Sequence, residues 1–231
     1  MDVEFLLILC GLFFVAVLYS SVGHGGASGY LAVLSLTSYG VLESGWLKQH
    51  AWCLNLIVAS IAFYHYYRAG YHVPKLSLPF IAASVPFALM GGYVEVGGVI
   101  YDTLLSITLI WAAWRLFGVK EYEIGVGGGL PNPKVALPVG ASIGLISGVV
   151  GVGGGIFLSP ILLLKKWATP KTAAATAALF IWVNSLAGLC GAAASGQLVL
   201  EMDTLLPFVG VVLVGGIIGS HYGATIAPQQ I

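Results

Sequence analysis

Charged side chains are scarce in this sequence. Aspartate, glutamate, lysine and arginine make up 8% of the 231 residues, whereas about 25% is usual for a soluble globular domain. Hydrophobic residues make up 58%. This composition excludes an ordinary soluble domain and is typical of a protein that crosses the lipid bilayer several times.

Other absences exclude further classes of protein. Nine basic and nine acidic residues give a formal net charge of zero, so bulk electrostatics gives no case for nucleic acid as a partner. The three cysteines belong to no disulfide, redox or metal motif. The sequence has no HExxH motif and no close set of Cys and His, and its apolar segments hold no paired carboxylates. We therefore expect no enzyme activity, no metal and no cofactor.

The first helix is expected to stay in the mature protein. The opening residues Met1-Asp2-Val3-Glu4 are acidic, whereas a cleaved signal peptide begins with a basic region. The apolar stretch that follows is therefore interpreted as the first of several membrane helices.

Apolar stretches follow one another along most of the chain. A helix needs roughly 17 to 25 residues to cross a hydrocarbon core about 30 Å thick. Besides the stretches that are long enough, the chain has two apolar stretches, 28–40 and 156–165, that are too short to cross alone. Each of these two follows a glycine cluster. The fold class is therefore an all-α polytopic membrane protein. The predicted spans are residues 4–22, 46–67, 76–94, 99–118, 172–195 and, near the lower limit of length, 205–222.

The two glycine clusters indicate an internal repeat. Sliding the sequence against itself by 128 positions places Gly23, Gly25 and Gly26 on Gly151, Gly153 and Gly154, and Pro79 on Pro207; a shift of one more places Asn55 on Asn184. Such agreement of turn-forming residues divides the chain near residue 130. We expect a first repeat over residues 1–119, a linker over 120–134, and a second, incomplete repeat over 135–231 that lacks its last span.

The positions of the basic residues indicate whether the short apolar segments cross the membrane or return to the side from which they entered. If each half begins with a hairpin that bends at its glycines, every lysine and arginine except Lys48 lies on one side. If each begins with one broken span, the basic residues divide almost evenly. The positive-inside tendency favours hairpins, with the N-terminus outside the cell and residues 120–134 in the cytoplasm. Each hairpin and its following spans return the chain to the opposite face, so the second repeat is inverted, as in many secondary transporters.

The glycine bends are the candidate binding site. Non-helical backbone within the membrane survives only where it lines a cavity or is buried in protein, and each bend precedes a short helix whose first N–H groups attract anions. Inverted symmetry would bring these ends together around a small anion, with no buried lysine or arginine. Close packing of small residues is the alternative, and it suits Gly91-Gly92 and Gly215-Gly216 better than the bends. The predicted binding residues are Ser21, Gly23, His24, Gly25, Gly26, Ala27, Ser28, Asn55, Gly151, Gly153, Gly154, Gly155 and Asn184.

Three of these residues have side chains with alternative roles. His24 could contact the anion and take up a proton coupled to transport, or it could hold its loop by a hydrogen bond. Asn55 and Asn184 could brace the bends or line the site. Gln49 and His50 are expected nearer the membrane interface.

The motifs SVGHGGASGYLAVLSL and SGVVGVGGGIFLSPILLL, with TPKTAAATAALFIWVNSLAG after the second, resemble the paired signature of the sulfite exporter TauE/SafE family. The resemblance covers most of the chain. It implies a secondary transporter of sulfite, organosulfonates, related sulfur oxyanions or organic acids in the cytoplasmic membrane, and a further C-terminal helix that this sequence lacks. His24 departs from the small residue expected at its position. A passive anion channel is the alternative function, and a homodimer would rest on precedent alone.

Overall fold

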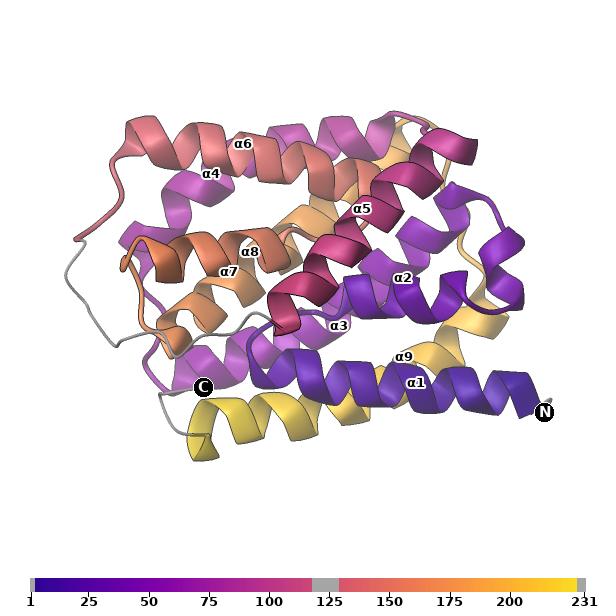
Figure 1. Cartoon of the computed structure of the whole chain (residues 1–231), viewed down its shortest axis with the longest axis horizontal. Coiled ribbons are helices and arrows are strands. Elements are labelled where there is room, and N and C mark those ends of the chain that lie inside the picture. The colour runs from indigo at the N-terminus through magenta and orange to yellow at the C-terminus, as the bar shows by residue number, and fades with distance from the viewer. Residues whose placement is uncertain (1–2, 118–128, 228–231) are drawn as a thin grey trace.

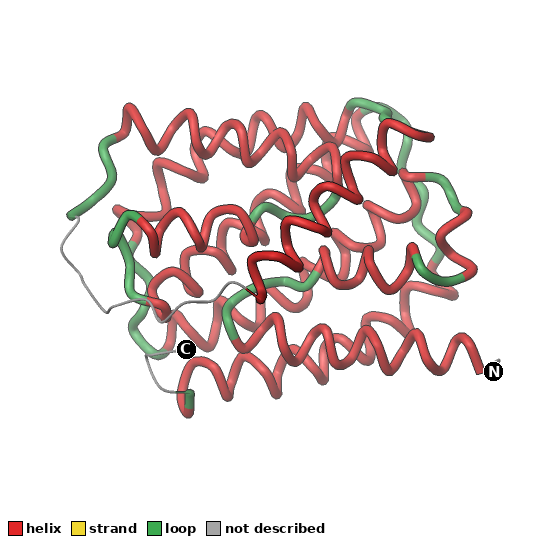
Figure 2. Tube along the Cα trace, viewed as in Figure 1, coloured by secondary structure: helices red, strands yellow, loops and turns green. Residues whose placement is uncertain are grey.

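The computed structural model describes residues 3–117 and 129–227, without the side chains of residues 115–117. Regular structure in these ranges is helical (Figures 1 and 2). Residues 120–128 of the predicted linker lie outside the description. The elements before the linker are α1 (Val3–Ser21), α2 (Ala27–Ser35), the 3-10 turn η1 (Ser38–Val41), α3 (Ser44–Arg68), α4 (Pro74–Tyr93) and α5 (Gly98–Phe117); those after it are α6 (Pro133–Val150), α7 (Gly155–Leu164), α8 (Pro170–Ala194), α9 (Met202–His221) and the π-helical turn η2 (Tyr222–Ile226).

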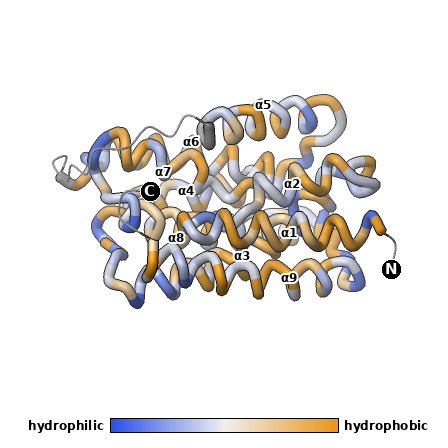
Figure 3. The backbone as a smooth tube through the Cα atoms, turned by 60° about the horizontal axis from the view of Figure 1, so that its bottom comes forward, coloured by the Kyte–Doolittle hydropathy of each residue, from blue (hydrophilic) through white to orange (hydrophobic). Residues whose placement is uncertain are grey.

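Five segments of the described chain are long and apolar enough to cross a membrane, namely α1, α4, α6, α8 and the continuous stretch Met202–Ile226. Figure 3 shows hydrophobic residues along most of α1 and α9, and hydrophilic residues gathered at the ends of the bundle. The predicted spans omitted α6, because Pro138 and several glycines and serines interrupt its apolar residues. Those small residues instead let α6 approach α4 closely.

Helix α3 is long but more polar than these five segments. It has 25 residues, and Lys48, Gln49, His50 and Asn55 within it are each at most 2% exposed. Polar side chains in a membrane helix are tolerated where they face protein rather than lipid. Burial against the neighbouring helices therefore explains how α3 occupies the position of the predicted span 46–67.

Local sequence determines where several helices begin. Pro133 and Pro170 occupy the first turns of α6 and α8, where a missing N–H costs no intrahelical bond. The preceding Asn132 and Thr169 cap these helices, because their side chains accept hydrogen bonds from the first-turn N–H groups of Lys134 and Thr172. These caps fix the start of the helix that leads into the second bend and of the helix that packs behind it.

Helix α2 turns back toward the start of α1. The carboxylate of Glu4, in the first turn of α1, accepts a hydrogen bond of 2.7 Å from the backbone N–H of Ser38, which follows α2. In Figure 1, α1 runs from right to left and α2 runs back to the right. The first half of the chain therefore begins with a bent hairpin rather than with one broken span.

The helices of the two halves pack in matching pairs. Helix α4 lies against α6, and α9 lies against α1, while α3 and α8 pack against each other. In Figure 1, α6 runs in the direction opposite to α1, and α9 in the direction opposite to α4.

Close approach between these helices depends on glycine. A Cβ atom at Gly91 on α4 would lie 2.7 Å from the carbonyl oxygen of Leu145 on α6. A Cβ at Gly215 on α9 would lie 2.7 Å from the carbonyl oxygen of Phe13 on α1. Both distances are far shorter than real contacts of a Cβ, so the predicted packing role of these glycines is confirmed.

Candidate functional site

The two glycine clusters form non-helical bends in the interior of the bundle. Figure 2 shows them as loops among the helices, apart from the loops at the two ends. Positive φ angles are open to glycine at little cost and are strained for other residues. The bend glycines with positive φ are Gly23 (75°), Gly26 (99°), Gly151 (95°), Gly153 (75°) and Gly154 (84°).

The side chain of Asn55 on α3 lies against both bends. A Cβ atom at Gly25 would collide with its Oδ1, and a Cβ at Gly153 would lie 2.5 Å from its Nδ2. Ile181 on α8 is the second shared neighbour, 2.9 Å from each of these two Cβ positions. The structure therefore brings the two clusters together, although 128 residues separate them in the sequence.

Hydrogen bonds fix the amide of Asn55 in this place. Its Oδ1 accepts a bond of 3.0 Å from the backbone N–H of Ala27, the first residue of α2. Its Nδ2 donates to Ser185 Oγ on α8 at 3.2 Å. Asn55 thus caps the helix after the first bend and also connects α3 to α8.

The imidazole of His24 extends from the first bend to the helix that follows the second. Its Nδ1 lies 3.1 Å from the carbonyl oxygen of Val22, and its Nε2 lies 3.3 Å from Ser159 Oγ on α7. Its Cδ2 would lie 3.4 Å from a Cβ at Gly155. His24 therefore holds its own loop and also contacts the first turns of α7.

Asn184, which the predicted repeat aligns with Asn55, is buried on α8 next to Ser185. With 3.6 residues per turn, its direction around α8 falls between those of Phe180 and Ile181. A Cβ at Gly154 would lie 2.8 Å from the ring of Phe180, and Ile181 adjoins Gly153. Asn184 is 1% exposed, and neither atom of its amide has a hydrogen-bond partner in residues 3–117 and 129–227.

The remaining predicted residues lie around these contacts. The hydroxyl of Ser28, in the first turn of α2, donates to Tyr19 Oη at 3.1 Å. Ser21 lies at the end of α1, where its hydroxyl bonds the carbonyl of Leu18 in its own helix. The Ser21 hydroxyl therefore bonds its own helix rather than either bend.

Two lysines correct the expectation that no basic residue is buried. Lys48 is 2% exposed and Lys171 is 8% exposed. A Cβ at Gly151 would lie 2.6 Å from Lys48 Cβ, while the Lys48 amine lies 3.4 Å from the carbonyl of Val94. The Lys171 amine donates to the carbonyl of Ala224 at 3.2 Å. The sequence does not reveal this burial, because both lysines lie near helix starts, where a solvated position is the usual one.

The sequence profile of the sulfite exporter TauE/SafE family matches residues 7–231. The chain belongs to this family. A probable membrane transporter protein, y4hK, of Sinorhizobium fredii is 32% identical over 230 residues, which cover 96% of this chain and 91% of that protein. The sulfite exporter TauE/SafE family protein 1 of Arabidopsis thaliana is 33% identical over 117 residues, or 46% of this chain and 25% of that protein. No solved structure matches the chain.

Four residues of this TauE/SafE protein join the candidate site without having been predicted. Ser185 and Ile181 lie on α8, Ser159 lies on α7, and Ser147 lies on α6. The Oγ of Ser147 would collide with a Cβ at Gly154. Ser147 and Ser159 lie within the second family motif, so the motif itself was the available signal. Ser185 and Ile181 lie in the segment 169–188 that follows this motif in the family signature, so the same signal was available for them.

Gln49 and His50 attach the loop between α8 and α9 to α3. Gln49 Nε2 donates to the carbonyl of Gln197 at 2.7 Å, and its Oε1 accepts from Val199 N–H at 2.6 Å. His50 Nε2 accepts from Glu201 N–H at 3.3 Å. Their hydrogen bonds to other elements go to this loop and not to the bends. Their position nearer the membrane interface stays a prediction.

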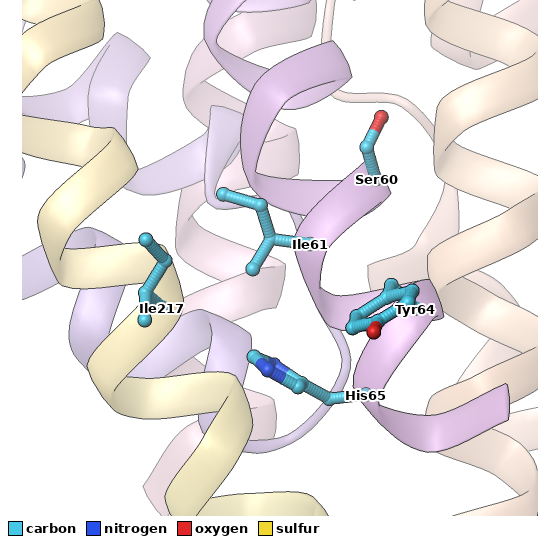
Figure 4. A pocket seen from close by; sticks show the side chains of 5 residues that line it. All are labelled: Ser60, Ile61, Tyr64, His65 and Ile217. Carbon is cyan, nitrogen blue, oxygen red and sulfur yellow. The ribbon is translucent and has the colours of Figure 1, made fainter. Parts of the chain in front are cut away.

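A groove of about 380 Å³ lies between α3 and α9, apart from the bends. Ser60, Ile61, Tyr64, His65 and Ile217 line it (Figure 4). His65 Nδ1 lies 2.8 Å from Ser220 Oγ. Because Tyr64 and Ile217 are 55% and 45% exposed, this groove opens on the outer surface of the bundle.

Proposed function

We propose that this TauE/SafE membrane transporter carries small anions across the cytoplasmic membrane and binds them where its two glycine bends meet. Sulfite, organosulfonates and related sulfur oxyanions are the substrates that we expect first, with organic acids next. The observation that carries the proposal is the position of Asn55, whose amide lies against Gly25 and Gly153 together. This contact supports the proposal that the N-termini of α2 and α7 lie close together and share one bound anion.

Helix N-termini suit a small anion for two physical reasons. Their first N–H groups have no partner within the helix, and the helix dipole places a partial positive charge, roughly half an elementary charge, at that end. Glycine leaves no Cβ between the ligand and the backbone. Two such ends can hold an oxyanion in an interior where a free lysine amine would be costly.

The proposed topology is an inverted repeat. The exchange of packing partners between α1, α4, α6 and α9 supports it, as do the opposite directions of α1 and α6 in Figure 1. We take residues 1–119 and 135–231 as the two repeats, with the N-terminus outside and residues 120–134 in the cytoplasm. Alternating access then arises when one repeat moves relative to the other around the bends.

Flux into proteoliposomes tests this function. Purified protein is reconstituted, and uptake of sulfite and of a short organosulfonate is measured against concentration, with empty liposomes as the control. A carrier gives saturable flux and accelerated exchange when unlabelled anion is present on the far side. Flux that rises in proportion to concentration without exchange would indicate a channel, and absence of anion flux would overturn the proposal.

A further inference from the structure

We propose that Asn184, rather than its repeat counterpart Asn55, contacts the transported anion, and that this anion carries a hydrogen-bond donor of its own. This inference rests on the function proposed above and narrows the substrate class. It follows from the different hydrogen bonding of two residues that occupy matching places in the two halves.

The amide of Asn55 is fully engaged within the protein. Its Oδ1 accepts from Ala27 N–H at 3.0 Å, and its Nδ2 donates to Ser185 Oγ at 3.2 Å. Because the same amide lies between Gly25 and Gly153, turning it toward a ligand would break the cap of α2. Asn55 therefore acts as a structural brace.

The amide of Asn184 is buried to the same degree, and both of its polar atoms lack a partner among the described residues. Buried polar groups in proteins are nearly always hydrogen-bonded, and a group that is not calls for a specific explanation. Its direction around α8 falls between Phe180 and Ile181, and these two residues adjoin Gly154 and Gly153 of the second bend. Among the described residues, α7 begins at the N-cap Gly154 without a side-chain cap bond, whereas Asn55 caps α2.

A second unpaired group faces the same helix end. Ser147 on α6 is 1% exposed, and its hydroxyl has no partner in the part of the chain that the structure describes. Its Oγ occupies the space that a Cβ at Gly154 would fill, and Gly154 is the N-cap residue of α7. Ser147 of α6 therefore lies at the N-terminus of α7 without a partner in the described chain, and the unpaired Asn184 lies on α8 beside two residues that adjoin the same bend.

The chemistry of these groups defines the ligand. Helix N–H groups and Asn184 Nδ2 donate hydrogen bonds, which suits the oxygens of a small oxyanion. Asn184 Oδ1 can only accept, so it is satisfied by a ligand that donates. A hydroxysulfonate, an aminosulfonate or a protonated oxyanion such as hydrogen sulfite meets both demands, whereas an unsubstituted sulfonate meets only the first.

The first bend contributes one further donor. Tyr30 is fully buried, its hydroxyl has no partner within the described ranges, and its Oη would lie 2.6 Å from a Cβ at Gly26, the N-cap residue of α2. This hydroxyl therefore gives the start of α2 an unpaired donor, as Ser147 does at the start of α7.

The experiment compares two ligands that differ by one hydroxyl group. Binding of 2-hydroxyethanesulfonate and of ethanesulfonate to the purified protein is measured by titration calorimetry in detergent. We expect the hydroxylated ligand to bind at least about tenfold more tightly, because a site built to bond a hydroxyl rejects the analogue that lacks it. Equal affinities for the two sulfonates would overturn this inference and leave the proposed anion transport intact. If neither sulfonate nor sulfite binds, the proposed function itself is contradicted.

Paired variants assign the preference to a residue. Asn184→Leu should abolish the preference for the hydroxylated ligand without lowering the melting temperature of the ligand-free protein. Asn55→Leu should lower that melting temperature by several degrees, because it leaves Ala27 N–H unpaired. A preference that survives in Asn184→Leu would overturn the inference.

A milder variant keeps the test decisive if Asn184→Leu fails to fold. Ser147→Ala should weaken binding of 2-hydroxyethanesulfonate by about two- to tenfold, the worth of one hydrogen bond. Ser142→Ala on the exposed face of the same helix is the matched control and should bind as the unaltered protein does. Unchanged binding in Ser147→Ala would contradict the role assigned to this end of α7.

Discussion

The imidazole of His24 lies 3.3 Å from the hydroxyl of Ser159, so a residue of the first bend contacts the helix that follows the second. The two residues are 135 positions apart in the sequence. The same imidazole also bonds the carbonyl of Val22 within its own loop. A single side chain therefore connects the two regions that must separate if the two halves move relative to each other.

Replacement of His24 tests this connection. His24→Ala removes both contacts, and we expect weaker anion affinity together with a flatter pH dependence of transport between about pH 5 and pH 8, where a histidine changes charge. Proteoliposome uptake at a series of pH values measures both effects. His24→Gln keeps hydrogen-bonding capacity but does not titrate, so it should recover affinity while the pH profile stays flat. If His24→Ala retains both the affinity and the pH profile of the unaltered protein, direct participation of His24 is wrong.

Alanine at the meeting point of the bends should be strongly destabilising. A Cβ at Gly25 collides with Asn55 Oδ1, and one at Gly153 lies 2.5 Å from Asn55 Nδ2, where Gly153 also has a φ of 75°. We expect Gly25→Ala and Gly153→Ala each to lower the free energy of unfolding by about 1–3 kcal/mol through overpacking. Thermal unfolding in detergent measures the change.

Gly210 provides the matched control. It lies inside α9 with open space around its Cβ position. Gly210→Ala should be neutral or stabilising by about 0.5–1 kcal/mol, because alanine restricts the unfolded chain. A bend substitution no more harmful than Gly210→Ala would show that the two bends are not in contact.

Gln49 is expected to stabilise the fold without taking part in transport. Gln49→Leu removes the bonds to Gln197 and Val199 and leaves two backbone groups of that loop without their partner. Each of these part-buried hydrogen bonds contributes about 0.5–1.5 kcal/mol, so the melting temperature should fall. Protein that remains folded below that temperature should keep the affinity for sulfite; a loss of affinity with unchanged stability would place Gln49 in the binding site.

The direction of insertion can be tested in cells. Reporter fusions after Pro74 and after Pro131 should both read cytoplasmic, and a fusion after Gly97 should read extracellular. The reason is that basic residues gather in the loops holding the first two points. An extracellular signal after Pro74 would reverse the proposed topology.

Sequence patterns predicted most of the helices because long apolar runs and positioned prolines are local features. The prediction missed helix α6, because the glycines that let it pack closely against α4 also lower the mean hydropathy of its sequence. The burial of Lys48 could not be foreseen, because it depends on contact between Lys48 Cβ and Gly151 in the other half. Bulk hydropathy reports only what lies nearby along the chain.

The asparagine pair shows the same limit within the candidate site. The repeat aligned Asn55 with Asn184 and left bracing and lining as alternative roles for both. Only the tertiary contacts distinguish them: Asn55 bonds Ala27 and Ser185, whereas the amide of Asn184 has no partner in the described chain. Equivalent positions in a repeat therefore need not keep equivalent chemistry.

Hydrogen–deuterium exchange of the protein in lipid nanodiscs tests most directly whether the bends bind an anion with their backbone. Peptides covering residues 22–30 and 150–160 are followed with and without 2-hydroxyethanesulfonate, with choline chloride at equal ionic strength as the control. The proposed site predicts slower exchange on adding the sulfonate at the start of α7, and to a lesser extent at the start of α2, with little change in the groove between α3 and α9. Unchanged exchange in both bends, under conditions where the sulfonate is bound, would contradict it.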